Sequence, residues 1–589
     1  MATKDSINKR LLQYINLAWD VKNISNLNPL VHLMIEGINN ELLLLDNKLE
    51  DIDISVSNKL VRRLLPKAYN YIRPSHAILQ VNPSVPIYKL DKHVSFTMKE
   101  LPDNVRRQGI SSVSFTPVVN TTIYDINITH IFCDRTLWSI NDKKRKVLGY
   151  SKMRAQYNTV WLGVDIAPEI KTLKDIAFYL DFEHLQDHHD YYETMSELKW
   201  YINEKTLKMK SGFHISFPKE ISETEKSVLD LYQDHYQTLV DKIELKDIPT
   251  KKMPDELSDI MDEGIMSSIP PLYWISIIFP ANFLLEDVEK ISISLNAIPV
   301  LNRYNNNKTV LRKDFETIIS LSSGLGQEFL DIESISDTAN NIYNRENELK
   351  EDYSYTIEPI QRKNIEDPRI IDYLERLADI VQHERAAFPD IDNEKIVDVL
   401  NAVLSIQDKD TQRVELNRLK EYAEIALLTL KSGEKATSAN VSYWTTHADL
   451  INGIVKGTDL MASKIPELNK SNAILLTETN GGRNLYNMES LKAINNFYLT
   501  SKDRILTKYN ILSFCKIELG GYIENIDVVR KAIISHKLKG GIIIVMEIQV
   551  TPKRQYIDHF KQKGVFKDLF IRLQQRSPNN FNYRIKLIE

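Results

Sequence analysis

The chain has 589 residues, and its 75 basic side chains against 80 acidic ones give a formal net charge of −5. At about 150 residues per domain, this length predicts several domains. The hydrophobic fraction of 43% is enough to build their cores and excludes a disordered chain. A near-neutral charge balance argues against a bulk binder of nucleic acid or of anionic membranes.

Cysteine usage and hydropathy indicate the compartment. Only Cys133 and Cys515 are present, which excludes a disulfide framework and a cysteine-only zinc site and favours a reducing environment. No apolar run is long enough to span a bilayer, and the first residues lack the apolar core of a signal peptide. We therefore expect a cytoplasmic protein with no direct membrane insertion.

The N-terminal segment, residues 1–75, is expected to be helical. A helix is predicted to begin at Asn28-Pro29, an N-cap residue followed by proline. Apolar residues then recur at alternating spacings of 4 and 3 and form a heptad-like seam: Val31, Ile35, Ile38, Leu42, Leu45, Leu49 and Ile52. This seam predicts either a helix packed inside its own domain or an intermolecular bundle.

The rest of the chain is predicted to form three further units. Residues 76–337 show a period of two, typical of a β-rich body, with helices such as 223–245 between the strands. Helical spacing returns in residues 338–505. Residues 506–589 read as helix, two strands, helix and strand, a small α/β domain of split βαβ type. The expected fold class is a multi-domain, elongated α+β scaffold.

The search for catalytic chemistry is negative. No phosphate-binding loop, nucleophile elbow or HExxH zinc motif is present, and the Gly481-Gly482 pair lies in a turn. The one cluster with ligand chemistry contains His184, Asp187 and His188, and a solvated turn is its favoured interpretation. We therefore predict no catalytic residues, no metal site and no cofactor.

The C-terminal helix carries several basic residues, among them Lys561, Lys563 and Lys567. A solvated face is the simplest interpretation, and contact with an acidic protein is the alternative.

Four segments in chain order resemble one protein family. Residues 28–38 resemble its Asp-Pro-x-Val-x-x-Leu-x-Glu-Gly-Phe signature, and residues 64–75 its Leu-Tyr-Pro-His-Tyr-Leu-Arg-Pro-x-Pro-Ser run. Residues 296–303 resemble its Asn-Ala-Phe-Pro-Val-Val-Asn-Arg core, and the strands at 161–165 and 178–182 also fit. The family is TssF, a baseplate subunit of the bacterial type VI secretion system. The matching motif positions are Pro29, Glu36, Tyr69, Arg73, Pro74, Asn296, Pro299, Asn302 and Arg303.

The resemblance has departures that indicate a divergent branch. Asn28 stands for aspartate, Ala68-Tyr69 stands where His-Tyr is common, and Ile38 and Ile298 replace phenylalanine. The C-terminal segment instead resembles small α/β domains of phage baseplate wedge proteins.

The resemblance implies a structural wedge subunit rather than an enzyme. It would assemble around the spike hub and initiate the contractile sheath, at the inner face of the cytoplasmic membrane. The implied partners are TssG, with two TssF copies for each TssG, a second copy of the chain, TssK, TssE and the VgrG hub. Nucleic acid is not an expected partner. The alternatives are a metal-dependent hydrolase with an unrecognised site and a nucleic-acid-binding adaptor.

Overall fold

The computed structural model describes residues 72–589, except 108, 142–143, 183–190, 193, 204, 215–220, 282, 316, 325, 347–351, 360–422, 432–435, 463–464, 485–487, 535–540, 558–559, 561–562, 579–580 and 589. Before residue 72 it describes Ile38, Leu42, Val56 and Leu60 alone.

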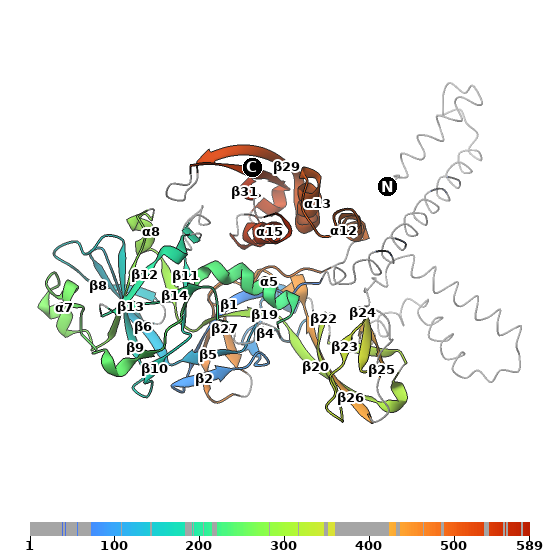
Figure 1. Ribbon diagram of the computed structural model, residues 1–589, viewed down its shortest axis with the longest axis horizontal. Helices are drawn as coiled ribbons and strands as arrows, with labels where there is room; N and C mark the ends of the chain where they lie inside the picture. The colour runs from blue at the N-terminus through green and yellow to red at the C-terminus, as the bar shows by residue number, and fades with distance from the viewer. Residues whose placement is uncertain are drawn as a thin grey trace, which may run out of the picture.

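A closed barrel forms the middle of the molecule (Figure 1). In order around the barrel, its strands are β1 (His76–Pro83), β19 (Ala297–Leu301), β4 (Ser114–Pro117), β3 (Phe96–Met98), β27 (Asp459–Ala462) and β28 (Leu468–Leu475). Strand β1 is apolar on both faces because Leu79 points into the barrel core while Ile78 packs outward against helix α5 (Glu223–Tyr232). The two-stranded sheet of β2 (Ile87–Leu90) and β5 (Thr121–Tyr124) lies beside it.

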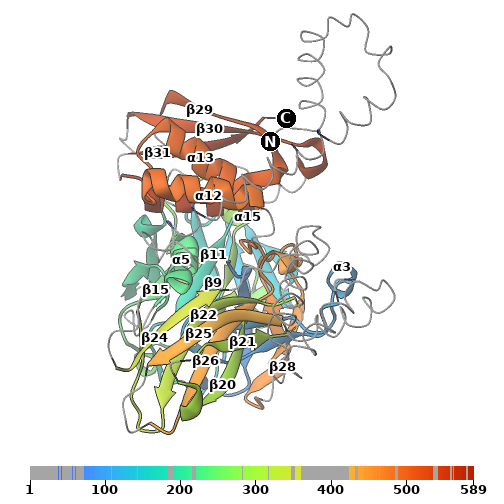
Figure 2. The same cartoon turned by 90° about the vertical axis from the view of Figure 1, so that its right-hand side faces the viewer.

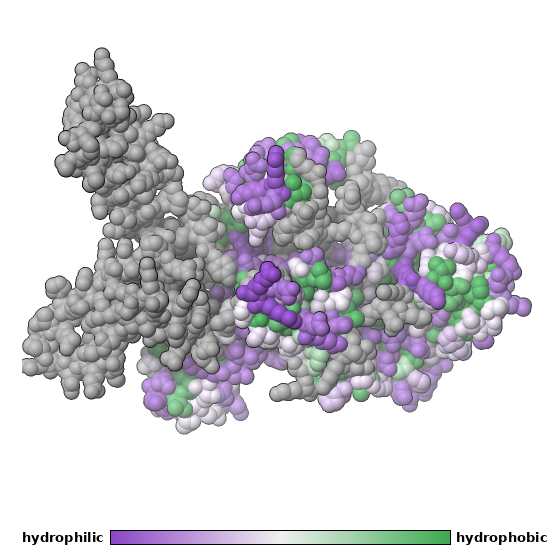
Figure 3. All heavy atoms as spheres, turned by 180° about the vertical axis from the view of Figure 1, so that it is seen from behind, coloured by the Kyte–Doolittle hydropathy of each residue, from purple (hydrophilic) through white to green (hydrophobic). Residues whose placement is uncertain are grey.

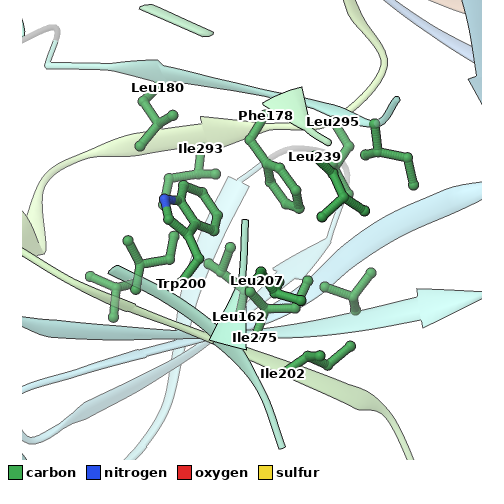
Figure 4. Packing of buried hydrophobic residues seen from close by; sticks show 14 of the residues in the cluster. Leu162, Phe178, Leu180, Trp200, Ile202, Leu207, Leu239, Ile275, Ile293 and Leu295 are labelled. Atoms are coloured by element: carbon green, nitrogen blue, oxygen red, sulfur yellow. The ribbon is translucent and has the colours of Figure 1, made fainter. Parts of the chain in front are cut away.

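The largest core lies between two sheets next to the barrel. The first sheet contains β13 (Lys205–Leu207), β12 (Lys199–Ile202), β17 (Tyr273–Ile278), β9 (Thr159–Ile166), β6 (Ile126–Cys133), β7 (Thr136–Asn141) and β8 (Lys144–Tyr150). The second contains β14 (Met209–Ser211), β15 (Tyr236–Leu239), β11 (Ala177–Asp181) and β18 (Ser292–Ser294). Figure 4 shows Phe178 and Leu239 from the second sheet facing Leu162 and Ile275 from the first, with Trp200 between them.

Short elements complete this part of the body. They are β10 (Thr172–Leu173), which pairs with β16 (Ile243–Glu244), and the helices α3 (Asp103–Arg106), α6 (Asp255–Ser258), α7 (Glu263–Ser267) and α8 (Leu285–Glu289).

A β-sandwich packs against the other side of the barrel. One layer is β20 (Tyr304–Leu311), β26 (Ser438–Thr446) and β22 (Glu328–Asp337), and the other is β21 (Ile319–Ser323), β25 (Ala423–Lys431), β24 (Ser354–Pro359) and β23 (Asn344–Arg345). Strands β24 and β25 pair antiparallel up to Pro359↔Ala426. The C-terminal end of β24 and the N-terminal end of β25 therefore lie side by side.

The last part of the chain forms a C-terminal unit (residues 488–588), seen at the top of Figure 2. It contains α12 (Met488–Ser501), α13 (Lys508–Leu519), β29 (Ile523–Ile534), β30 (Ile542–Pro552), α15 (Lys563–Arg576) and β31 (Asn582–Leu587). The order of elements from α13 to β31 confirms the prediction of helix, two strands, helix and strand. Helix α15 contacts α5 of the body, where Gln575 donates to Asp230 at 3.3 Å and Ile571 joins an apolar cluster.

The prediction of a helical region over 338–505 is wrong for most of the residues that the structure describes there. Strands β23 to β28 lie in this described part, and α12 is the one long helix there. Within β25, Ala426, Leu428 and Leu430 are buried with a period of two instead of the expected helical spacing. Pairing of β25 with both β24 and β21 overrides the helix propensity of a leucine-rich run.

The helix predicted over 223–245 is also too long. Helix α5 begins at a capping box, in which the Ser222 hydroxyl accepts from Glu225 N, and ends at Tyr232. Tyr236–Leu239 is strand β15 because it pairs with β11 on one side and β14 on the other.

The α+β, multi-domain class is confirmed. The domain boundaries at 75, 337 and 505 stay predictions, although the barrel combines strands from both sides of residue 337. Strands β27 and β28 follow residue 337 in the chain. They pair with β3 and β1, which belong to the predicted β-rich body.

Candidate functional site

The motif positions divide by whether the structure describes them. Pro29, Glu36 and Tyr69 lie outside the described residues. The other six lie at the barrel or at its contacts with neighbouring parts: Arg73, Pro74, Asn296, Pro299, Asn302 and Arg303.

Asn302 follows strand β19 and joins three segments through its fully buried carboxamide. Its Oδ1 accepts hydrogen bonds from His447 N at 3.0 Å and from Thr446 Oγ1 at 3.2 Å, at the end of β26. Its Nδ2 donates to Ser114 O at 2.9 Å in β4. The side chain therefore connects the barrel with the sandwich.

Arg303 is the most completely bonded charged residue of this junction. Its Nη1 lies 2.6 Å from Glu225 Oε1, and its side chain also donates to Thr116 Oγ1 at 2.7 Å and to Pro117 O at 2.8 Å. The guanidinium carbon lies 4.1 Å from the centre of the Trp444 ring. The pair is almost inaccessible, with 2% of the Arg303 side chain and 4% of the Glu225 side chain exposed.

Glu225 has a second role at the start of α5. Its Oε2 accepts from Ser222 N at 2.9 Å, while the Ser222 hydroxyl accepts from Glu225 N at 3.2 Å. One carboxylate thus caps α5 and neutralises Arg303, so the helix, the barrel and the sandwich are fixed at one point.

Asn296 and Pro299 set the start and course of β19. Asn296 adopts a φ of 53°, and its carboxamide exchanges hydrogen bonds with the backbone of Tyr124 at 2.7 and 3.2 Å. Asparagine tolerates this left-handed conformation better than most side chains. Pro299 pairs with Ile78, and its carbonyl accepts from Val118 N at 3.0 Å.

Arg73 connects the body with the C-terminal unit. Its Nη2 lies 2.6 Å from Glu518 Oε2, and Arg483 Nη1 lies 3.1 Å from the other carboxylate oxygen. Burial of the Glu518 carboxyl opposes its ionisation, but the guanidinium groups of Arg73 and Arg483 outweigh burial and hold its pKa well below its usual range. The side chains are only slightly accessible, 17% for each arginine and 12% for the glutamate.

The segment that contains Gly481-Gly482 holds the second arginine in place. Arg73 and Arg483 form a backbone bridge with hydrogen bonds of 3.0 Å in both directions. A Cβ at Gly482 would lie 2.3 Å from both Ala448 O and Ser75 Oγ. Glycine is needed here for close packing of the backbone. The prediction of a turn at this pair is wrong, because residues 480–483 run antiparallel to residues 73–76.

Several residues of these junctions were not identified from the sequence. The Ser222-x-x-Glu225 spacing is a capping-box signature and could have located Glu225. No local sequence pattern marks Glu518 or Trp444, because their partners are distant in the chain. Glu518 lies 445 residues from Arg73, and Trp444 contacts Arg303.

The predicted interface residues are only partly described. Ile38 and Leu42 are helical and exposed, at 49% and 39%, whereas Val31, Ile35, Leu45 and Leu49 lie outside the described residues. Lys563 and Lys567 lie on α15, but their side chains are not described, and Lys561 lies outside the described residues. The assignment of these nine residues to interfaces stays a prediction.

The basic C-terminal helix is less solvated than the simplest interpretation of the sequence implied. Arg572 is buried, and Arg576 Nε lies 2.7 Å from Asp503 Oδ1. Phe560, which precedes α15, is buried in one apolar cluster with Leu569 and Leu573 of that helix.

Chemistry-bearing groups give no reaction site within the part of the chain that the structure describes. Burial raises the pKa of the Cys133 thiol to about 12 and also raises the pKa of Cys515, so neither is an activated nucleophile. No group of three or more His, Cys, Asp or Glu side chains among the described residues could hold a metal ion. His184, Asp187 and His188 lie outside them.

Among the described residues, no helix is long and apolar enough to cross a bilayer.

Apolar side chains gather on the surface at the end of the molecule where β8 and α7 lie, at the right of Figure 3. Exposed Tyr150 and Met153 belong to this end.

Comparison with known proteins finds a similarity among solved structures. No family model matches the sequence, and no curated protein matches it. Among solved structures, the chain is similar to a chain in the cryo-electron microscopy structure of the type VI secretion system TssK-TssF-TssG baseplate subcomplex. The identity is 10%, the match covers 95% of this chain and 96% of that chain, and the TM-score is 0.42. We draw no residue-by-residue correspondence from this similarity.

Proposed function

We propose that this chain is a non-catalytic wedge subunit of a type VI secretion baseplate, of the TssF type. The observation that supports this proposal is the structural use of three described motif positions. Asn302 and Arg303 bind the barrel, the sandwich and α5 together, and Arg73 attaches the C-terminal unit. A motif selected to hold parts of a chain in fixed relation suits a load-transmitting scaffold.

The burial of these residues also separates this role from catalysis. A catalytic arginine must reach a substrate, whereas both hydrogen-bonding edges of Arg303 are occupied by Glu225, Thr116 and Pro117. The wedge would bind TssG through the N-terminal helices, with two copies of the chain for each TssG. It would also contact TssK, TssE and the VgrG hub, and help to initiate the sheath.

The test is assembly with TssG and TssK. We expect the full chain, co-expressed with TssG and TssK, to co-elute with TssG, and native mass spectrometry to give two copies for each TssG. Ile38→Asp with Leu42→Asp should abolish co-elution, since a carboxylate buried in an apolar interface costs several kcal/mol.

The matched control replaces two exposed apolar residues of the body, Leu311 and Val455, by aspartate. This control should leave co-elution unchanged. A folded chain that never associates with TssG would refute the proposal. Equal co-elution of the two double variants with TssG would show that the N-terminal seam is not the TssG contact.

A further inference from the structure

The β29–β30 hairpin of the C-terminal unit is longer than the sheet that contains it. Strands β29 and β30 pair continuously as far as Ile534↔Ile542. The third strand, β31, begins its pairing only at Val545. The end of the hairpin therefore projects as a two-stranded ribbon, visible in Figures 1 and 2.

One face of this sheet is covered by helices. Ile526 and Val528 of β29 and Ile548 and Val550 of β30 belong to a single apolar cluster with the helices of the unit. The helical members include Phe514 and Ile511 from α13 and Leu569 and Leu573 from α15. The opposite face mixes polar and apolar groups: Glu547 Oε1 lies 2.6 Å from Lys531 Nζ, and Val545 is on the same face. The sheet thus has one apolar, helix-covered side and one mixed side.

The helix-covered face continues past the helices without a cover. Side chains alternate along a strand, so Ile544 and Ile542 lie on the same face as Ile548 and Met546. Ile542 is 76% exposed and Ile544 is 51% exposed, and Ala532, which pairs with Ile544, is exposed as well. We call these three residues the bare sheet end.

We propose that the bare sheet end is a docking site for an amphipathic helix of another protein, with acidic residues beside its apolar stripe. Continuity supports a helix, because the same face is covered by helices α13 and α15 within the unit itself. Charge supports acidic flanks, because Arg530, the residue before the bare sheet end on this face, is exposed. Such docking adds one more helix to an existing sheet–helix layer.

Two other occupants fit less well. In the hydrocarbon of a membrane, the ribbon would leave the unpaired edges of β29 and of Ile542–Ile544 without hydrogen-bond partners, which open sheet edges do not tolerate. A second copy of the chain would bring a second Arg530 to the same face, where like charges repel. An acid-flanked helix avoids both costs.

This proposal stands apart from the proposed baseplate function, because it rests on the exposure of the hairpin and names no baseplate protein. Failure of TssG binding would leave it standing, and its own failure would leave TssG binding untouched.

The direct test uses synthetic helices and the full chain. The probe is a fluorescein-labelled, hydrocarbon-stapled peptide with leucines at i, i+3, i+4 and i+7 and glutamates on both sides of that stripe. A second peptide replaces the glutamates by lysines, and a third scrambles the leucines so that no apolar face forms. We expect saturable binding of the acidic peptide by fluorescence anisotropy, and binding at least about tenfold weaker for the other two.

The variant Ile542→Asn with Ile544→Asn should weaken binding of the acidic peptide by about tenfold or more. Arg530→Gln should weaken it less and remove most of its salt dependence. The matched control, Ile318→Asn with Ile342→Asn, changes two isoleucines that are each 72% exposed elsewhere on the body, and should bind like the native chain. Circular dichroism checks that each variant is folded.

The remaining measurements distinguish the other occupants. Absence of saturable binding, or equal binding by the native chain and the Ile542/Ile544 variant, overturns the proposal. Equal binding of the acidic and basic peptides overturns its charge argument. Sedimentation velocity that shows a native dimer lost in the variant assigns the site to a second copy. Flotation with phosphatidylglycerol vesicles, lost in the variant, assigns it to lipid.

Discussion

Two arginine–glutamate contacts, one buried and one partly buried, join parts of this molecule, and they differ in where they lie. The Arg303–Glu225 pair lies inside the body, where both side chains are nearly inaccessible. The Arg73–Glu518–Arg483 group lies between the body and the C-terminal unit and is somewhat more accessible. Both have a closest contact of 2.6 Å, and both use an arginine from the family motifs.

The positions of the two contacts determine what each of them controls. A buried ion pair adds little net stability over an apolar pair, but removal of one partner leaves an uncompensated charge. Inside the body that charge would destabilise the whole barrel and sandwich junction. Between the two parts, the C-terminal unit can separate and let water reach the charge, so the damage stays local.

The largest expected effect comes from Arg303→Met. The change leaves Glu225 buried without its cation, and we expect a loss of about 3–5 kcal/mol in the free energy of unfolding of the body, measured by urea denaturation. The double variant Arg303→Met with Glu225→Met should recover much of this, less about 1 kcal/mol for the lost cap of α5. A double variant no more stable than the single one would show that the charge is not the cause.

A smaller and more local effect is expected from Glu518→Gln. The amide keeps the shape but removes the negative charge between Arg73 and Arg483, which should cost about 2–3 kcal/mol in the docking of the C-terminal unit. Hydrogen exchange should rise in residues 480–484 and α13, while the barrel strands stay protected.

The control for this change is Asp503→Asn, which breaks the more exposed Arg576 contact inside the C-terminal unit. It should leave exchange at residues 480–484 unchanged. Loss of protection throughout the barrel in the Glu518 variant would contradict the separation of the two contacts.

Gly482→Ala tests the closely packed segment that positions Arg483. The added methyl group would meet Ala448 O and Ser75 Oγ, so the backbone must shift, at about 1–2 kcal/mol. Gly264→Ala is the control, because no atom lies within 4 Å of its Cβ position. Thermal unfolding should show a lower midpoint for the first variant and no loss for the second.

The sequence predicted those features that depend on local pattern. The C-terminal order of elements followed from the period of two in β29 and β30 and the helical spacing of α13 and α15. The strand β25 was missed because its leucines at spacing three also fit a helix, and only its two neighbouring strands decide. Motif positions such as Arg73 were recognised as residues of interest, but the partner Glu518 is set by the tertiary fold.

The smallest expected effect concerns His93, which joins the barrel to the sandwich near the inner pair. Its ring stacks on Trp444 with centroids 5.5 Å apart, and its Nε2 lies 3.5 Å from Glu333 Oε1. The hydrogen bond to Glu333 raises the pKa of His93 despite partial burial. Burial opposes ionisation of Glu333, but His93, Lys92 and Trp444 outweigh it and lower its pKa to about 2.

The signs of these shifts define a pH window. A raised histidine pKa contributes stability that is fully present below about pH 6.5 and is lost as the pH rises through the folded value. A lowered glutamate pKa contributes stability that is present above about pH 4.5 and is lost as the pH falls toward 2. The contact should therefore stabilise the protein most between about pH 4.5 and 6.5.

The variant His93→Asn should lose more stability at about pH 6 than at about pH 8.5, by a few tenths of a kcal/mol because the histidine is half exposed. Urea denaturation at a series of pH values, followed by tryptophan fluorescence, measures this difference. His214→Asn removes another histidine contact, 3.8 Å from Asp175, and serves as the control for loss of an exposed histidine. A His93 difference that does not change with pH, or that grows as the pH rises, would show that the Trp444 stack rather than the charge joins the barrel to the sandwich here.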